Sequence, residues 1–287
     1  MDPDDSIRKV YERRKQEFAC RALELGHRKA LEYIWYHTID LGNGLVTPGV
    51  YDYRETVSAF QFPPDMHGMR VLDIGSATGF FAFEFERRGA AVTSVDLPSL
   101  KQLDRFPGQS TDDLILKIQR MQFPRKAGGP CNKSYSATEM YHLLLDGPFR
   151  FCKRVLRSNG RRRYSSIYDL SLRKLGTKQP FDLVFLGDVL IHTIAPLQAL
   201  AAIAPLCGRT LVLSQVMDDD DAAEPAMIYT GGATPDDEIS WWQPNKNCFV
   251  QILKKLGFTE ITQVGKNCGY LQHEAYWFER PILHAVK

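Results

Sequence analysis

The feature that most constrains this chain is the stretch VLDIGSATGF, from Val71 to Phe80. It begins as a short apolar run typical of a buried strand, turns through Gly75 and Gly79, and continues into an apolar segment, 80–86, typical of a helix. A strand that enters a helix through a glycine turn brings backbone N–H groups close to a bound ligand. The stretch therefore predicts a β-α unit whose turn binds a ligand.

The glycine spacing argues against two common nucleotide sites. Gly-x-x-x-Gly differs from the dinucleotide fingerprint, and no Lys-Ser or Lys-Thr follows it, as a phosphate-binding P-loop requires. A second predicted strand, 91–95, ends at Asp96. An acidic residue at this point of a β-α-β unit accepts hydrogen bonds from ribose hydroxyls. A glycine turn in some other α/β protein is the alternative.

With these residues the chain resembles the class I S-adenosylmethionine (SAM)-dependent methyltransferases. The resemblance implies an α/β fold with a Rossmann-like doubly wound sheet, SAM as cofactor, S-adenosylhomocysteine (SAH) as product, and no metal. It also implies that Asp73 and the glycine loop hold the methionine part and that Asp96 holds the ribose diol. The implied cofactor-binding residues are Asp73, Gly75, Ser76, Ala77, Thr78, Gly79, Asp96, Leu97, Asp169, Leu170 and Gly187.

Later segments resemble one branch of that superfamily, the bacterial tRNA wobble-uridine carboxymethyltransferases and their relatives. The similarity lies in the segments 168–170, 181–192, 196–197, 242–244 and 256–258. It implies that Asp169 accepts from the adenine amine and that Leu170 packs against the ring; a strand-end turn is the alternative for Asp169.

Two departures favour plain SAM over carboxy-SAM and put a tRNA substrate in doubt. Ile191 replaces a tyrosine of the carboxymethyltransferases, and no lysine occurs over 35–38. In the carboxymethyltransferases that tyrosine helps to hold the extra carboxylate of carboxy-SAM. A carboxylate without hydrogen-bond donors is strongly disfavoured in a pocket.

Methyl transfer from a sulfonium requires alignment of the acceptor, exclusion of water and, for many acceptors, removal of a proton. His192 is the first candidate for the base, because it follows the strand that faces the SAM sulfur in the resembled family and titrates near neutrality. Asp188 is the second. The alternatives are a histidine packed at a helix start and a loop hydrogen-bonder. The candidate substrate-binding residues are Tyr51, Tyr53, His192, Trp241 and Trp242, whose aromatic rings fit either a pocket wall or an ordinary core.

Two parts are predicted along the chain. Residues 1–62 are predicted to form a helical cap and an aromatic loop. The helical pattern covers 6–36 and is divided at Gly26. The cap lies either across the cofactor cleft or on the outside of the sheet. Residues 63–287 form the SAM-binding domain. The third strand is expected only at 163–170, so residues 101–162, called the insertion below, interrupt the sheet and are predicted to lie above its C-terminal edge. Further strands are predicted at 181–188, 209–216, 258–264, 270–280 and 282–286, and a helix capped by Asn245 at 246–256.

Composition bears on partners and location. The formal net charge of +2 is too small to indicate nucleic acid or an anionic membrane as partner. The basic cluster of the insertion suggests either RNA contact or a solvated helix face; it comprises Arg150, Lys153, Arg154, Arg157, Arg161, Arg162 and Arg163. The six cysteines are scattered along the chain, which predicts free thiols in a reducing compartment and no metal site. The N-terminus is polar, and the apolar runs are shorter than the ~18 residues of a membrane span, so the protein is expected to be cytoplasmic.

Three functions follow from these observations. The first is O- or N-methylation of a small-molecule acceptor, with specialised metabolism as the expected setting. The second is a tRNA-modifying methyl- or carboxymethyltransferase, and the third a SAM-binding module without catalysis. The sequence carries no signal for the oligomeric state.

Overall fold

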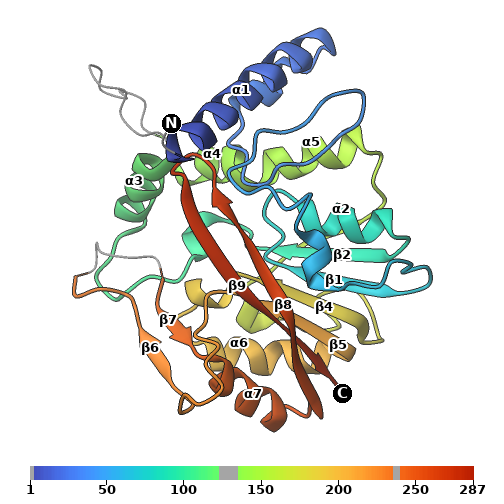
Figure 1. The fold of residues 1–287 in the computed structure, drawn as a ribbon, viewed down its shortest axis with the longest axis vertical. Helices are drawn as coiled ribbons and strands as arrows, with labels where there is room; N and C mark the ends of the chain where they lie inside the picture. Colours follow the sequence, from blue (N-terminus) through green and yellow to red (C-terminus); the bar gives the residue numbers. More distant parts are fainter. Residues whose placement is uncertain (1–2, 123–134, 235–239) are drawn as a thin grey trace.

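A seven-stranded sheet forms the centre of the computed structural model, which describes residues 3–122, 135–234 and 240–287 (Figure 1). The strand order is β3-β2-β1-β4-β5-β9-β8; the first five strands are parallel, and β9 runs antiparallel to both β5 and β8. The predicted doubly wound sheet is thereby confirmed. The strands are β1 (Arg70–Ile74), β2 (Ala91–Asp96), β3 (Arg161–Tyr164), β4 (Phe181–Gly187), β5 (Cys207–Ser214), β8 (Glu260–Leu271) and β9 (Tyr276–Val286).

Side chains alternate between the two faces of the central strands, as the strand period of two requires. Val71, Leu183 and Phe185 pack towards α1 (Pro3–Glu24), α2 (Phe80–Arg87) and α5 (Gly147–Val155). Their strand neighbours Leu72, Val184 and Leu186 pack towards α6 (Pro196–Ile203) and α7 (Lys246–Lys255). The sheet is therefore the middle of three layers, with α2 and α6 on opposite faces (Figure 1).

The N-terminal helix is shorter than the helical pattern predicted. α1 ends at Glu24, and Gly26 adopts a positive φ of 75°, a left-handed conformation that favours glycine. A short 3₁₀ helix, η1 (Arg28–Glu32), follows, and the chain then runs irregularly through the aromatic segment, defined here as residues 35–53. The predicted helix over 6–36 is thus wrong beyond Glu24. Another short 3₁₀ helix, η2 (Val57–Phe60), leads towards β1.

The insertion is mainly helical. It holds η3 (Leu100–Gln102), α3 (Thr111–Gln122), α4 (Ala137–Tyr141), a π-helical turn η4 (His142–Asp146) and α5. A separate apolar cluster that includes Leu114, Ile118 and Met140 holds α3 against α4. Residues 123–134, a part of the insertion that includes Cys131, lie outside the described residues.

Two strand predictions are wrong in detail. The third strand covers 161–164 rather than 163–170, because the chain turns at Ser165 into the 3₁₀ helix η5 (Ile167–Asp169). The three predicted C-terminal strands are two long ones, since β9 continues through Pro281, which pairs with Lys266. The helix capped by Asn245 is confirmed: the Asn245 side chain accepts from the amide of Cys248 at 2.9 Å. The remaining elements are η6 (Leu190–His192), η7 (Ala204–Leu206) and the two-stranded sheet of β6 (Met227–Tyr229) and β7 (Trp242–Pro244).

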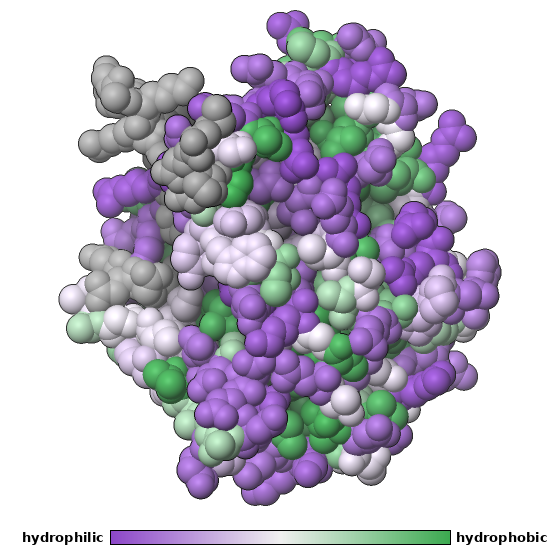
Figure 2. Space-filling view, viewed as in Figure 1, coloured by the Kyte–Doolittle hydropathy of each residue, from purple (hydrophilic) through white to green (hydrophobic). Residues whose placement is uncertain are grey.

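The face of the molecule in Figure 2 is mostly hydrophilic, with apolar residues in small groups between hydrophilic ones. Within the described parts of the chain, no helix combines the length and the apolar character that crossing a membrane takes. Five cysteines are free thiols: Cys20, Cys152, Cys207, Cys248 and Cys268.

Candidate functional site

A cavity of about 420 Å³ opens at the carboxyl ends of the parallel strands. Strand order reverses between β1 and β4, and ligands of doubly wound sheets bind outside this reversal point. The walls come from the loop after β1, the ends of β2 and β4, the aromatic segment, the insertion and the hairpin of β8 and β9. Segments far apart in the sequence therefore meet around one space.

The loop after β1 needs glycine at both ends. Gly75 and Gly79 have φ values of 73° and 100°. A Cβ on Gly75 would lie 2.3 Å from Cγ2 of Val189, and one on Gly79 would lie 2.6 Å from the Phe83 ring. The turn is thus set by both backbone conformation and space.

The amides of this loop are occupied within the protein. Gly75 and Ser76 donate to the carbonyl of Val95 at 2.9 and 3.2 Å, and Ala77 donates to Oδ2 of Asp96 at 2.9 Å. The expectation that these three amides face a ligand is wrong; they tie the loop to β2. Gly75, Ser76 and Ala77 nevertheless line the cavity, whereas Thr78 and Gly79 do not.

Thr78 joins the loop to the aromatic segment: its Oγ1 accepts from the amide of His37 at 3.1 Å. The amide of Phe80 lies 3.4 Å from Nδ1 of His37, so the imidazole caps the first turn of α2. Burial lowers the pKa of His37 to about 3, so the ring stays neutral. His37 lines the cavity and was not predicted; the aromatic run around it was the available signal.

Asp73, at the carboxyl end of β1, is 1% exposed and lines the cavity. Its Oδ2 has no hydrogen-bond partner among the described residues. Burial, followed by the charge of Asp96, raises the pKa of Asp73 to about 7. A buried, unpartnered oxygen beside a cavity is suited to a donor from a ligand.

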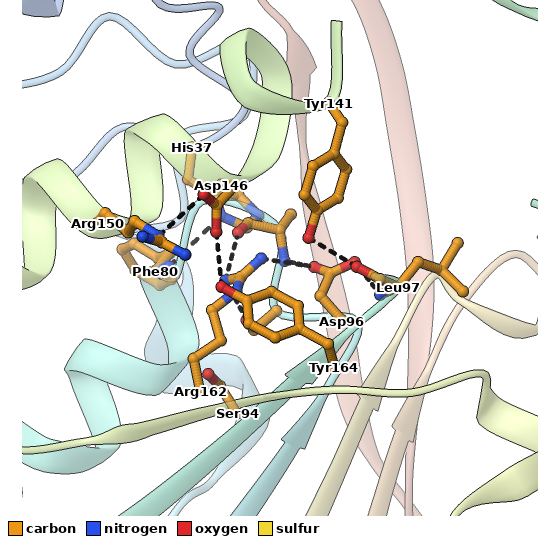
Figure 3. A network of polar contacts seen from close by, with 12 residues as sticks. His37, Phe80, Ser94, Asp96, Leu97, Tyr141, Asp146, Arg150, Arg162 and Tyr164 are labelled. Carbon is orange, nitrogen blue, oxygen red and sulfur yellow. Dashed lines mark hydrogen bonds and ion pairs between the residues drawn. The ribbon is translucent and has the colours of Figure 1, made fainter. Parts of the chain in front are cut away.

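Asp96, at the end of β2, is held by three donors. Its Oδ2 accepts from Ala77 and from Nη2 of Arg162 at 3.2 Å, and its Oδ1 accepts from the amide of Leu97 at 2.8 Å (Figure 3). Burial raises the pKa of Asp96, and the positive charge of Arg162 opposes that shift. Arg162 belongs to the predicted basic cluster, and its site role was missed, because the predicted third strand began only at residue 163 whereas β3 begins at Arg161 and pairs with β2.

The predicted adenine contacts are arranged differently. Leu97 lines the cavity. The Asp169 side chain is 66% exposed and pairs with Lys174 at 3.6 Å, and neither Asp169 nor Leu170 lines the cavity. The chain leaves strand geometry at Ser165, which changes the face on which later residues lie. Their places in the cavity wall are taken by Ser165, Ser166, Ile167 and Tyr168.

Of the predicted aromatic walls, two lie at the cavity and two do not. Tyr51 and Tyr53 line it with their rings stacked, 5.8 Å between centroids, and Tyr36 joins them. Trp241 is buried against Phe106. Trp242 donates from Nε1 to the carbonyl of Ile194 at 2.9 Å. Both tryptophans pack beside the small β6–β7 sheet instead of the cavity.

Gly187, Asp188 and His192 all line the cavity at the end of β4. Both carboxylate oxygens of Asp188 accept from Nε of Arg280, and Oδ1 also lies 3.3 Å from the amide of Val216. These bonds support the loop-bonding alternative for Asp188. His192 ends η6 and so faces the same space as the glycine loop.

The N-terminal helix α1 is bonded to two segments that contribute to the cavity wall, although no residue of α1 lines the cavity among the described residues. Nη1 of Arg14, on α1, donates to Oδ2 of Asp52 at 3.0 Å and to Oε1 of Gln272 at 3.1 Å. This contact joins the cap, the aromatic segment and the tip of the β8–β9 hairpin. Among the described residues, no cluster of three His, Cys, Asp or Glu side chains could hold a metal ion.

The sequence profile of the methyltransferase-domain family matches residues 51–263. No curated protein matches the sequence significantly. Among solved structures, EvdMO1 is similar at 15% identity with a TM-score of 0.51, covering 92% of this chain and 47% of that one. That likeness concerns the fold alone.

Two further solved structures are similar with lower TM-scores. Magnesium protoporphyrin IX methyltransferase from Synechocystis PCC 6803, with bound SAM, matches at 17% identity and a TM-score of 0.44, covering 77% of this chain and 71% of that one. 1,6-Didemethyltoxoflavin-N1-methyltransferase from Burkholderia thailandensis matches at 15% identity and a TM-score of 0.40, covering 77% and 72%.

Proposed function

This chain belongs to the family of methyltransferase domains and is a SAM-dependent methyltransferase, and from that premise we propose that it methylates an oxygen or nitrogen of a small molecule. The observation that carries the proposal is one cavity lined by two buried carboxyl groups, Asp73 and Asp96, from adjacent strand ends.

The residues around the cavity suit SAM. The unpartnered Oδ2 of Asp73 can accept from the ammonium of the methionine part. Asp96 has acceptor capacity left on Oδ1 for a ribose hydroxyl. Apolar side chains, among them Leu97, Leu100 and Ile167, offer a surface for the adenine ring.

SAM supplies a methyl group on a positively charged sulfur. The protein's part is to align the acceptor, exclude water and accept a proton where the acceptor requires it. Tyr36, Tyr51 and Tyr53 form an aromatic wall for this purpose, and burial raises the pKa of each phenol, so the hydroxyls stay protonated. We assign the proton-accepting role to His192, because it lies at the cavity wall after β4 and a neutral imidazole can accept a proton. Asp188, the second candidate, is bonded to Arg280.

The contacts of the basic cluster favour a small acceptor over RNA. Arg150 pairs with Asp146 at 2.9 Å, Lys153 donates to the carbonyl of Gly160 at 2.6 Å, and Arg162 is buried against Asp96. Each of these three cations already has a partner within the protein, although the Arg150 side chain is 67% exposed, and these contacts leave less of their charge for phosphates. Transfer of a carboxymethyl group is disfavoured as well, because Asp188 already neutralises Arg280 in the cavity.

Two measurements test the proposal. Calorimetry with SAM and SAH should give saturable binding, and radiolabelled methyl transfer to a panel of hydroxyl- and amine-bearing small molecules should give product. Heat without transfer to any acceptor would leave a binding module instead. Salt-sensitive binding of tRNA with methyl transfer to it would overturn the small-molecule assignment.

A further inference from the structure

We propose that Arg162 is a positioning residue that fixes Asp96 for contact with the cofactor ribose, an inference that rests on the proposed SAM-binding function. Figure 3 shows the guanidinium between the glycine loop, the end of β2 and Tyr164. The guanidinium is buried, since the Arg162 side chain is 5% exposed.

The guanidinium bridges two elements of the cofactor site. Nη1 donates to Oγ of Ser76 at 3.1 Å and to the carbonyl of Ala77 at 3.0 Å, while Nη2 donates to Oδ2 of Asp96 at 3.2 Å. Its central carbon lies 4.0 Å from the centre of the Phe149 ring, on α5. A planar, always charged fork held on an aromatic face is well suited to this bridge, and lysine is a poor substitute.

The hydrogen bond from Arg162 determines which carboxylate oxygen of Asp96 remains available to a ligand. A carboxylate oxygen accepts about two hydrogen bonds. Oδ2 already accepts from Ala77 and Arg162, whereas Oδ1 accepts from the Leu97 amide. Arg162 therefore occupies one oxygen and leaves Oδ1 for a ribose hydroxyl.

The positive charge of Arg162 also offsets the repulsion between two neighbouring carboxyl groups. Asp73 and Asp96 are both buried and repel each other, and Arg162 acts against that repulsion on each. Asp146, Tyr141 and Tyr164 also face this group: the Tyr164 hydroxyl donates to Asp146 at 2.6 Å, and the Tyr141 hydroxyl donates to the Leu97 carbonyl at 2.7 Å.

These contacts tie the insertion to the ribose site, because Tyr141 and Asp146 both belong to it. Loss of Arg162 should therefore free Asp96 from a fixed orientation while the surrounding contacts of Tyr164 and Tyr141 remain. A loss of that kind affects recognition of the ribose more than recognition of the rest of the cofactor.

The test compares SAH with an SAH analogue that lacks both ribose hydroxyls. Calorimetry gives the ratio of the two dissociation constants for the wild type, Arg162→Met and Arg162→Lys. The control is Arg161→Met, an exposed neighbour on the same strand. We expect the wild type and the control to bind SAH about 10- to 100-fold more tightly than the analogue, as hydrogen bonds to a charged group allow.

For Arg162→Met we expect weaker SAH binding and a ratio close to one, with analogue binding nearly unchanged. Arg162→Lys should give an intermediate ratio, and it decides the question if the methionine variant does not fold. An unchanged ratio in Arg162→Met, including an equal loss of affinity for SAH and the analogue, would overturn the inference and indicate a general structural role. Failure of the wild type to bind SAH would instead count against the proposed function.

Discussion

Arg280 on β9 donates from Nε to both carboxylate oxygens of Asp188, at 3.0 and 2.9 Å, and thereby joins the last strand to the end of β4 at the cavity. The two side chains are 15% and 22% exposed. Partly buried pairs of this kind cost more to break than surface pairs, because one charge is left poorly solvated.

Breaking this pair should destabilise the fold. We expect Arg280→Met to lower the free energy of unfolding by about 1–3 kcal/mol, and Asp188→Asn with Arg280→Met to show coupling in a double-mutant cycle. The control is the exposed pair of Lys9 and Asp5, which should couple by about 0.5 kcal/mol or less. Chemical denaturation measures both cycles, and equal coupling energies would contradict the expectation.

Asp96 should dominate ribose recognition. We expect Asp96→Asn to weaken SAH binding by about 10- to 100-fold, since the amide loses the charge that a hydroxyl donor prefers. Asp169→Asn is the matched control, because Asp169 is exposed and lies outside the cavity wall. Calorimetry distinguishes them; a larger loss in Asp169→Asn would restore that residue to the cofactor site.

Two glycines with nearly the same φ allow the effect of steric space on stability to be separated from that of backbone strain. Gly75 and Gly26 have φ values of 73° and 75°, but only at Gly75 does an added Cβ meet another atom within 4 Å. Gly75→Ala should therefore cost about 1–3 kcal/mol of unfolding free energy more than Gly26→Ala. Equal costs in thermal denaturation would show that Val189 moves aside freely. Gly75→Val should in addition greatly weaken SAH binding.

Proton uptake by Asp73 gives a pH dependence with a defined sign. Its folded pKa of about 7 lies above the ordinary value of 3.8, so between these two values the folded state holds a proton that the unfolded state has lost. This group therefore contributes stability that falls as pH rises from about 4 to 7. Asp73→Asn should flatten that slope.

The same acid should release its proton when SAM binds, because an ammonium favours the carboxylate. Calorimetry in buffers of different ionisation enthalpy should detect the release at about pH 6 and lose it at about pH 8.5. Asp73→Asn is the control for the assignment. A release that persists in that variant would have to come from another group.

His192 should affect chemistry more than cofactor binding. For an O- or N-acceptor we expect His192→Asn to lower kcat by about 10²- to 10⁴-fold with SAH affinity nearly unchanged. His67→Asn serves as control, since His67 lies before β1, is exposed and bonds Asp65. A normal kcat in His192→Asn would leave proton removal to solvent or to the acceptor itself.

Local patterns predicted the parts of this protein that depend on neighbours in sequence. The β1 strand, the loop from Gly75 and α2 follow from apolar runs and glycine positions, and Asp96 follows from the strand that precedes it. The same holds for the cap at Asn245.

Residues that depend on distant contacts were harder to predict. Arg162 reads as part of a charge run, and its burial follows only from the pairing of β3 with β2. The two tryptophans read as pocket walls, whereas β6 and β7 pair beside the cavity. Asp169 was misplaced because a turn at Ser165 ends the strand early.

The bonds from Arg14 to Asp52 and Gln272 have a consequence for the enzyme's working cycle. They join α1, the aromatic segment and the tip of the β8–β9 hairpin, a junction called the latch here, and the last two of these stretches contribute residues to the cavity wall. We expect entry of the acceptor and release of the product to be faster when the latch is open. We therefore expect the pace of turnover to follow the opening of this latch at least as closely as the transfer step. A protein loosened there would exchange its ligands faster and admit more water.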